Sequence, residues 1–200
     1  SNTDVGTASV LIRGAGYYIG SVRKTFRITP DKKSKIKAAL SKPEEEIFYS
    51  PAGVTPDITV SYEDSGRELT KGKDYKLKFS SNKKTGQASC TVSFLGNYKG
   101  HTAIKLMFAI EPASLDGAEA FATDMVYTKP GKYAPAMYVT LDGSLLGKKD
   151  YTVVRYDGET ELKATDKLKL ESGEDEKELT FKIYGRGNYS SDVPIIGTYY

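Results

Sequence analysis

The 200-residue chain has very little of the residue types that build catalytic and metal sites. It contains one cysteine, one histidine and no tryptophan. One cysteine cannot form an internal disulfide, and one cysteine with one histidine cannot supply the usual ligands of a zinc site. We therefore expect no metal, no cofactor and no catalytic residue, and we expect that the chain is not an enzyme.

The chain also lacks a strong charge of either sign and any long hydrophobic run. Its 29 basic and 26 acidic residues leave a net charge of +3, which is too small to indicate a dedicated nucleic-acid binder. No apolar run approaches the roughly 20 residues that a membrane helix needs. A hydrophobic content of 38% is too high for a disordered tail. These values favour a folded protein, expected to be monomeric, that neither enters a membrane nor binds nucleic acid.

The first residues lack the features of a secretion signal. Ser1-Asn2-Thr3 has no initiator Met, and no basic stretch with an apolar core follows it. Ser-Asn resembles what tag removal leaves on a recombinant fragment. We therefore expect this chain to be a piece of something longer.

What is abundant is a repeated pattern. The segment Gly6–Gly20 matches Gly86–Gly100, and a third copy covers Leu179–Tyr189. The marker residues Gly16, Gly96 and Gly187 lie 80 and 91 residues apart. Solenoid units are roughly 20 to 50 residues long, so this longer period favours small autonomous domains in series.

The local pattern predicts β-strands throughout. Apolar residues alternate with polar ones over 86–94 and 75–79, which is typical of half-buried strands. The segment 36–40 is interpreted as a strand rather than as part of a helix over 31–40. Turn residues recur every 8 to 15 positions, as in all-β sandwiches. We predict tandem immunoglobulin-like antiparallel β-sandwich modules with about seven strands each.

The repeat also sets the predicted domain boundaries. Residues 1–29 are interpreted as the C-terminal hairpin of a preceding module, or as N-terminal strands packed on the next one. Residues 30–111 form a complete module, and residues 112–200 form another with an insertion at about 157–178.

The repeated signatures resemble a known group of proteins. In order, they are Pro-x-(Ile/Val)-x-Val, Leu-x-x-Gly-x-Asp-Tyr, Gly-x-Ala-x-(Val)-x-(Val), Gly-Asn-Tyr-x-Gly and Phe-x-Ile, seen in this chain at 56–60, 69–75, 86–92 (with Cys90 at the first Val position), 96–100 and 108–110. They look like the tandem immunoglobulin-like repeats of large cell-surface and secreted proteins of Gram-positive gut anaerobes. This resemblance implies an extracellular modular scaffold and transfers no catalytic residue.

Cys90 and His101 are the strongest candidates for a catalytic pair. A Cys–His dyad requires the two side chains within hydrogen-bonding reach. However, the repeat aligns Cys90 with Val10 and Phe181, which indicates a core position filled by a small hydrophobic residue. His101 follows a turn and has no histidine counterpart in the other copies, so an exposed loop position is expected.

Other candidate sites also favour structural roles. Two pairs, Asp74-Tyr75 and Asp150-Tyr151, follow a glycine-containing turn. In each pair we interpret the aspartate as a turn residue whose carboxylate accepts hydrogen bonds from backbone amides. We interpret the tyrosine as the first residue of a strand, with its ring in the core. Asn97-Tyr98 and Asn188-Tyr189 are interpreted as a hairpin bend with a tyrosine anchor. The loop 185–189 lacks the third glycine of a nucleotide-binding loop, and the acidic run 174–178 lacks the ligand spacing of a calcium loop.

The charge is shared unevenly along the chain. Residues 1–112 contain 18 basic and 11 acidic residues, whereas residues 113–200 contain 11 and 15. Opposite charges on neighbouring modules could orient the modules, or the basic module could attract anionic wall polymers. The simpler interpretation is that these charged side chains only lie on faces exposed to water.

The predicted function is a non-catalytic structural or adhesion segment, a stalk or display arm, of a bacterial cell-surface or secreted protein. The alternative is a glycan- or protein-binding module that uses the 157–178 insertion and neighbouring loops, since loops on a rigid sandwich commonly carry binding sites. The partners considered are a cell-wall polymer, a host glycan or a host protein.

Overall fold

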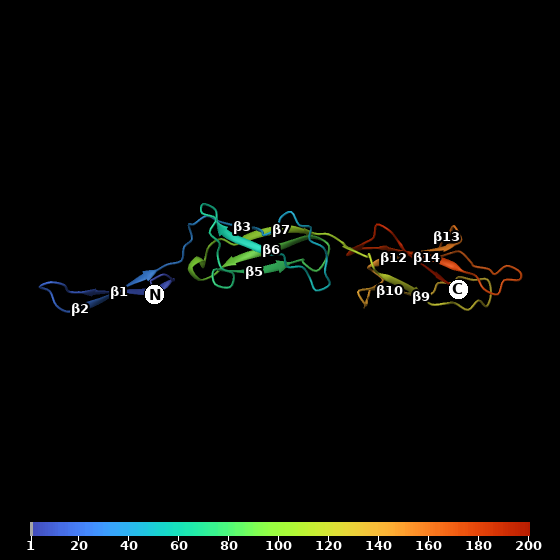
Figure 1. The fold of residues 1–200 in the computed structure, drawn as a ribbon, viewed down its shortest axis with the longest axis horizontal. Helices are drawn as coiled ribbons and strands as arrows, with labels where there is room; N and C mark the ends of the chain where they lie inside the picture. The colour runs from blue at the N-terminus through green and yellow to red at the C-terminus, as the bar shows by residue number, and fades with distance from the viewer. Residues whose placement is uncertain (1) are drawn as a thin grey trace. The chain divides into compact units, whose positions relative to one another are not determined.

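The computed structural model describes residues 2–200 and is all-β, as the alternating pattern predicts. The chain divides into two compact units, and in Figure 1 most of the first is blue to green and most of the second is yellow to red. The first unit comprises the chain up to Ile47 and Gly53–Ile110, and the second comprises Phe48–Ala52 and Glu111–Tyr200. Within residues 2–200 the structure contains no helix with the length and apolar character that crossing a bilayer requires.

The first unit contains three antiparallel sheets. They are the hairpin β1–β2, the pair β3–β4 and the three-stranded sheet β5–β6–β7. The predicted strand at 36–40 is confirmed. The strands and one short 3-10 turn are β1 (Gly6–Arg13), β2 (Ser21–Ile28), β3 (Ile36–Leu40), β4 (Ile58–Tyr62), β5 (Tyr75–Ser80), β6 (Gly86–Phe94), η1 (Gly96–Tyr98) and β7 (Ile104–Ile110).

The expected seven strands per module are wrong for this unit. Between residues 30 and 110 the structure has five strands, β3 to β7. The segment between β3 and β4 contains Pro43, Pro51 and Pro56, each of which lacks a backbone donor for a sheet ladder. Isolated bridges such as Ser61–Glu68 take the place of further strands. The sheets do not join into a closed sandwich.

The core of this unit lies between the sheets β3–β4 and β5–β6–β7. Strand β4 contributes Val60, and β6 contributes Ala88, Cys90 and Val92, each no more than 1% exposed. The alternation in β6 explains this burial, because every second side chain points to the same face.

The hairpin β1–β2 differs from the rest of the unit in its exposure. Within residues 2–200 its strands pair with each other and with no further strand. Ala8 is buried, whereas Val10, Ile12 and Phe26 are 44%, 53% and 46% exposed. An apolar row on this hairpin therefore remains largely open to solvent.

The second unit combines three sheets of different sizes. They are β11–β10–β9, the four-stranded β13–β12–β14–β16, and the short parallel pair β8–β15. The strands are β8 (Ala113–Ser114), β9 (Glu119–Ala122), β10 (Met137–Leu141), β11 (Ser144–Leu145), β12 (Tyr151–Asp157), β13 (Thr160–Leu162), β14 (Leu179–Gly185), β15 (Tyr189–Ser190) and β16 (Ile195–Tyr199).

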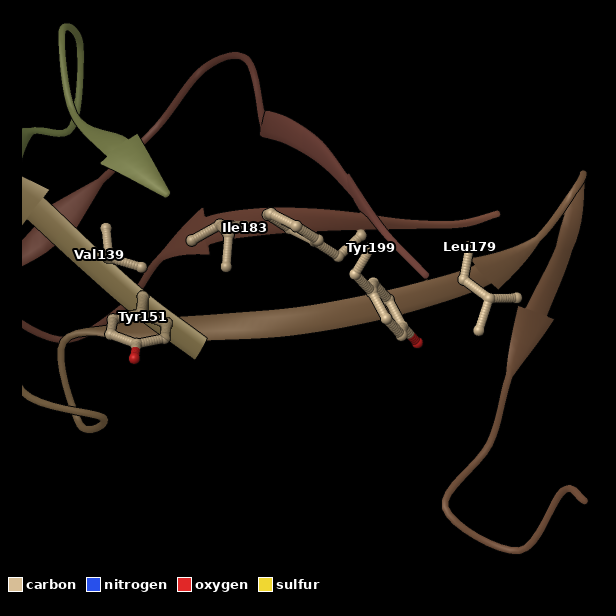
Figure 2. Close-up of a cluster of buried hydrophobic side chains, with 6 residues drawn as sticks. Val139, Tyr151, Leu179, Ile183 and Tyr199 are labelled. Atoms are coloured by element: carbon tan, nitrogen blue, oxygen red, sulfur yellow. The ribbon is translucent and has the colours of Figure 1, made fainter. Parts of the chain in front are cut away.

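The core of the second unit is a cluster of side chains from four of these strands. Figure 2 shows it spread along the sheet, from Val139 and Tyr151 at one end to Leu179 at the other. The buried members are Val139, Tyr151, Leu179, Phe181, Ile183 and Tyr199. Polar neighbours alternate with these residues in β14, where Thr180 and Lys182 are less buried.

Candidate functional site

Cys90 occupies a core position, as the repeat predicts. Its side chain is 0% exposed and lies in β6 opposite Phe79 and Leu106 of the neighbouring strands. Burial raises the pKa of the thiol. A reactive cysteine needs an exposed, electropositive environment that lowers its pKa. Cys90 therefore has the properties of a packing residue.

His101 is not the exposed loop residue that the sequence suggested. The side chain is half-buried, with its ring centroid 4.7 Å from that of Phe94. Its Nε2 lies 2.9 Å from the carbonyl oxygen of Ser34. The imidazole thus fastens the segment after η1 to the segment before β3, a contact that sequence proximity does not reveal.

Both tyrosines of the Asp-Tyr pairs have the predicted inward position, and Asp74 makes the predicted turn contact. Asp74 accepts a hydrogen bond from the Thr70 amide at 2.9 Å, and Tyr75 and Tyr151 are each 5% exposed. The Tyr75 hydroxyl donates to the Ile58 carbonyl at 3.5 Å, and the Tyr151 hydroxyl donates to the Met137 carbonyl at 3.2 Å. Each tyrosine therefore ties the start of one sheet to a strand of another.

Asn97 connects the N-terminal hairpin to the rest of the first unit. Its side-chain oxygen accepts from the Val5 amide at 2.7 Å, and its Nδ2 donates to Asp4 at 2.9 Å. Its backbone carbonyl accepts from the Asp31 amide at 2.7 Å. The bend itself is a 3-10 turn rather than the predicted hairpin loop.

Tyr98 anchors that turn, as predicted. Its hydroxyl is hydrogen-bonded to the Tyr62 hydroxyl, and the Arg67 guanidinium lies 4.8 Å from the centre of the Tyr62 ring. Burial and the bond to Tyr62 raise the pKa of Tyr98 to about 12. These groups line a polar cavity of about 560 Å³ beside the base of the β1–β2 hairpin. Within this lining Tyr62 contacts both Tyr98 and Arg67.

Tyr189 has the corresponding anchoring role in the second unit. It is 7% exposed and meets Tyr49 edge to face, with ring centroids 5.4 Å apart. The Asn188 carbonyl accepts from the Ala113 amide at 3.0 Å. A Cβ on Gly185 would approach the Ser190 backbone to 2.6 Å, so this glycine serves close packing of the turn.

The 157–178 insertion is partly structured. Its first residues extend β12 and form β13, and the loop that follows bonds to another long loop through the backbone groups of Gly131 and Leu168 at 2.8 and 3.2 Å. Lys177 forms an ion pair with Asp157 at 2.7 Å across the base of the insertion, which raises the pKa of Lys177. Among residues 2–200 no three His, Cys, Asp or Glu side chains gather closely enough to hold a metal ion.

A cavity of about 370 Å³ lies where this insertion meets the end of the core. The loop between β9 and β10, the loop between β13 and β14, and the ends of β14 and β16 form its walls. The lining side chains combine four tyrosines, four aliphatic or thioether groups, three carboxylates and two lysines: Tyr127, Tyr133, Tyr199, Tyr200, Met125, Leu168, Leu170, Leu179, Asp124, Asp175, Glu176, Lys169 and Lys177.

Defined contacts hold the aromatic walls in place. Tyr127 and Tyr133 stack with ring centroids 5.7 Å apart and an interplanar angle of 28°. The Tyr133 hydroxyl accepts from the Thr128 amide at 3.1 Å, which lowers its pKa, and donates to the Lys129 carbonyl at 2.6 Å. The Tyr200 hydroxyl donates to Glu178 at 2.6 Å, which raises its pKa. The cavity is thus a formed feature of the fold.

Tyr199 is the unusual member of the cavity lining. The residue is 1% exposed, and its hydroxyl has no hydrogen-bond partner within residues 2–200. Figure 2 shows its oxygen turned away from Val139 and Tyr151. Burial raises the pKa of this phenol. A buried hydroxyl without a partner is unfavourable, so a donor or acceptor that reached this atom would be stabilised by it.

Sequence reasoning named the insertion as a binding region but missed most of the cavity. Tyr127, Tyr133, Tyr199 and Tyr200 come from segments far apart in the chain. The available signal was that these tyrosines, apart from Tyr127, align with no tyrosine in the other copies of the repeat.

The comparisons with known proteins do not identify the chain. No protein-family model matches it. Among curated proteins and among solved structures, no match was found either.

Proposed function

We propose that the chain is a non-catalytic structural or adhesion segment, a stalk or display arm, built from tandem immunoglobulin-like modules. The observation that carries the proposal is that corresponding residues form the same hydrogen bonds inside both units. Such repetition is expected of a scaffold and is not expected of a unique active site.

The incoming chain is fastened to the Gly-Asn-Tyr turn in the same way in each unit. The Asp31 amide donates to the Asn97 carbonyl in the first unit, and the Ala113 amide donates to the Asn188 carbonyl in the second. Each donor lies just after the proline that follows a strand of the preceding repeat. A chain entry that is hydrogen-bonded to its own module in this way suits a segment that bears load between its ends.

The strand register supports the same repeat. Ala38 lies opposite Val60, and Ala120 lies opposite Val139. The Leu69 amide donates to the Val60 carbonyl and the Leu146 amide to the Val139 carbonyl, each at 2.8 Å.

The N-terminal hairpin follows the same pattern. Gly6 pairs with Ile28 and Ala8 with Phe26, matching the pairs Gly86–Ile110 and Ala88–Phe108 in β6 and β7. We infer that β1–β2 is the last hairpin of another module, whose remaining strands would cover its exposed apolar row. The extracellular location and bacterial cell-surface origin rest on the resemblance of the motifs.

Pulling on the chain from both ends tests the stalk function. In single-molecule force spectroscopy we expect two separate unfolding events in each trace, one per unit. A chain that extends without mechanical resistance would rule out a load-bearing role.

The cavity of the second unit favours a second candidate, a binding module that uses the insertion. Replacing residues 163–176 by a short Gly-Ser bridge removes five lining residues from its wall: Leu168, Lys169, Leu170, Asp175 and Glu176. Binding to glycan, wall-polymer or peptide arrays that disappears in this variant would support the second candidate. Binding retained without the loop would exclude the insertion as the site.

A further inference from the structure

We propose that the tyrosine-lined cavity of the second unit binds an organic cation, an alkylammonium or guanidinium group with an apolar stem. This inference rests on the second candidate function and specifies its ligand. The relevant cavity is the one of about 370 Å³ between the loop over 123–136, the loop over 163–178 and the ends of β14 and β16. Its volume falls in the lower part of the range of about 300–1,000 Å³ found for small-molecule sites.

The charges around the cavity favour a cation. Residues 157–178 contain nine acidic and four basic side chains. Both lysines in the cavity wall already face carboxylates: Lys177 lies 2.7 Å from Asp157, and Lys169 lies 3.8 Å from Glu171. Asp175 and Glu176 line the same wall and are exposed. A concave site lined by an excess of one charge raises the local concentration of the opposite ion.

The tyrosine rings supply the second element of cation recognition. Aromatic faces attract ammonium and guanidinium groups through the ring quadrupole, and several rings around one cation form an aromatic cage. Tyr127 and Tyr133 are fixed by stacking and by the bonds of the Tyr133 hydroxyl. Leu168, Leu170 and Met125 provide apolar surface for the methylene stem of such a ligand.

The unpartnered hydroxyl of Tyr199 provides the third element. Tyr199 lines the cavity, and its buried phenol oxygen can accept a hydrogen bond from an N–H donor that reaches it. A cationic donor makes the strongest such bond. A neutral sugar would satisfy the hydroxyl equally well but would leave the acidic wall without a counter-charge.

Titrating the ¹⁵N-labelled 200-residue chain tests this assignment, with chemical shifts followed by NMR. The probes are choline, cadaverine and short peptides that contain one lysine or one arginine. Neutral trisaccharides and a glutamate peptide serve as comparison ligands. We expect the cationic probes to shift the amides of residues 124–127, 168–177 and 199–200, with affinity falling as salt rises. Peptides binding better than free amines would identify a protein partner, and the reverse would identify a small amine.

Matched variants separate the local site from overall charge. Asp175→Asn with Glu176→Gln should weaken cation binding about tenfold or more. Glu159→Gln with Glu161→Gln changes the net charge equally at exposed positions outside this cavity and should leave binding nearly unchanged. Equal effects of the two pairs would overturn the assignment, because they would indicate non-specific attraction.

The tyrosines are tested in the same way. Tyr127→Ala should weaken binding several-fold, whereas Tyr138→Ala removes an exposed tyrosine outside the cavity and should not. Tyr199→Phe should weaken binding without loss of folding, since the missing hydroxyl has no partner within residues 2–200.

The outcomes for the two binding proposals are distinguishable. Cavity shifts caused by neutral sugars and not by cations would overturn the ligand class and leave the second candidate function standing. Absence of cavity shifts with every probe would overturn the ligand class, and array binding by the full chain would then be needed to keep any binding function.

Discussion

At the residue scale, the chain's scarce residue types serve as packing elements. Cys90 is buried between Phe79 and Leu106 in β5–β6–β7, and His101 packs on Phe94. Two residues that would attract attention in an enzyme are therefore used to hold sheets and turns together.

Substitutions at Cys90 should reveal its role as a small hydrophobic residue. Cys90→Val keeps an apolar side chain of similar size, and we expect a stability change of less than about 1.5 kcal/mol. Cys90→Ser buries a hydroxyl and should cost about 1–3 kcal/mol. Urea unfolding of the three proteins measures both changes. A serine variant as stable as the wild type would show that the position is not apolar.

Asp31 should give the first unit an acid-sensitive contribution to stability. Its carboxylate accepts hydrogen bonds from Ser34 Oγ and from the amides of Lys33 and Ser34, which lower its pKa from the ordinary 3.8. The unfolded chain then binds more protons than the folded one as the pH falls below about 4, so the stabilisation is present above that pH and lost below it.

The variant Asp31→Asn isolates this effect. We expect the wild type to melt at a higher temperature than the variant at pH 5, and the difference to vanish towards pH 2.5. Thermal unfolding at several pH values provides the comparison. A difference that stays constant with pH would mean that the charge of Asp31 contributes nothing.

At the element scale, the two units fill equivalent core positions with different combinations of volumes. Cys90 in β6 lies opposite Leu106, whereas Phe181 in β14 lies opposite Gly197. The first unit therefore pairs a small side chain, Cys90, with the larger Leu106, whereas the second unit pairs the large Phe181 with a glycine. A Cβ on Gly197 would come within 2.4 Å of the Phe181 ring.

This exchange predicts a coupled pair of mutations. Gly197→Ala should destabilise the second unit by about 1–3 kcal/mol, because the core is overpacked. Adding Phe181→Leu should recover part of that loss, since the smaller side chain makes room for the methyl group. A double-mutant cycle by chemical denaturation measures the coupling. Strict additivity would indicate that the ring and the glycine do not constrain each other.

The elements that could be predicted from sequence are those whose pattern is local. Period-two alternation located β5 and β6, because burial of one sheet face depends on neighbouring residues, and the charged stretch over 31–40 favoured a strand at 36–40 over a helix. Strand number could not be predicted in the same way. The spacing of turn residues suggested about seven strands, but the segment between β3 and β4, which contains Pro43 and Pro51, forms none.

The candidate site was less predictable than the strands. The inward position of Tyr75 and Tyr151 followed from the repeat, because both copies begin a strand with this tyrosine. The cavity brings together Tyr133, Leu168 and Tyr199 from three segments, and only the folded chain shows that Tyr199 lacks a hydrogen-bond partner within residues 2–200. The spacing of these residues in the sequence does not predict that they lie together in the folded chain.

At the scale of the whole molecule, the central claim is that the chain consists of autonomous modules with the same internal construction. Each unit has its own buried core, and the equivalent residues Val60 and Val139 are 1% and 0% exposed. If the units are autonomous, loss of a core methyl pair in one should leave the stability of the other unchanged.

The most direct test is differential scanning calorimetry of the wild type, Val60→Ala and Val139→Ala. Each substitution should cost about 2 kcal/mol, which corresponds to roughly 10 °C for a domain of this size. The account predicts two transitions, with Val60→Ala lowering one and Val139→Ala lowering the other. A single transition that both substitutions lower together would contradict it.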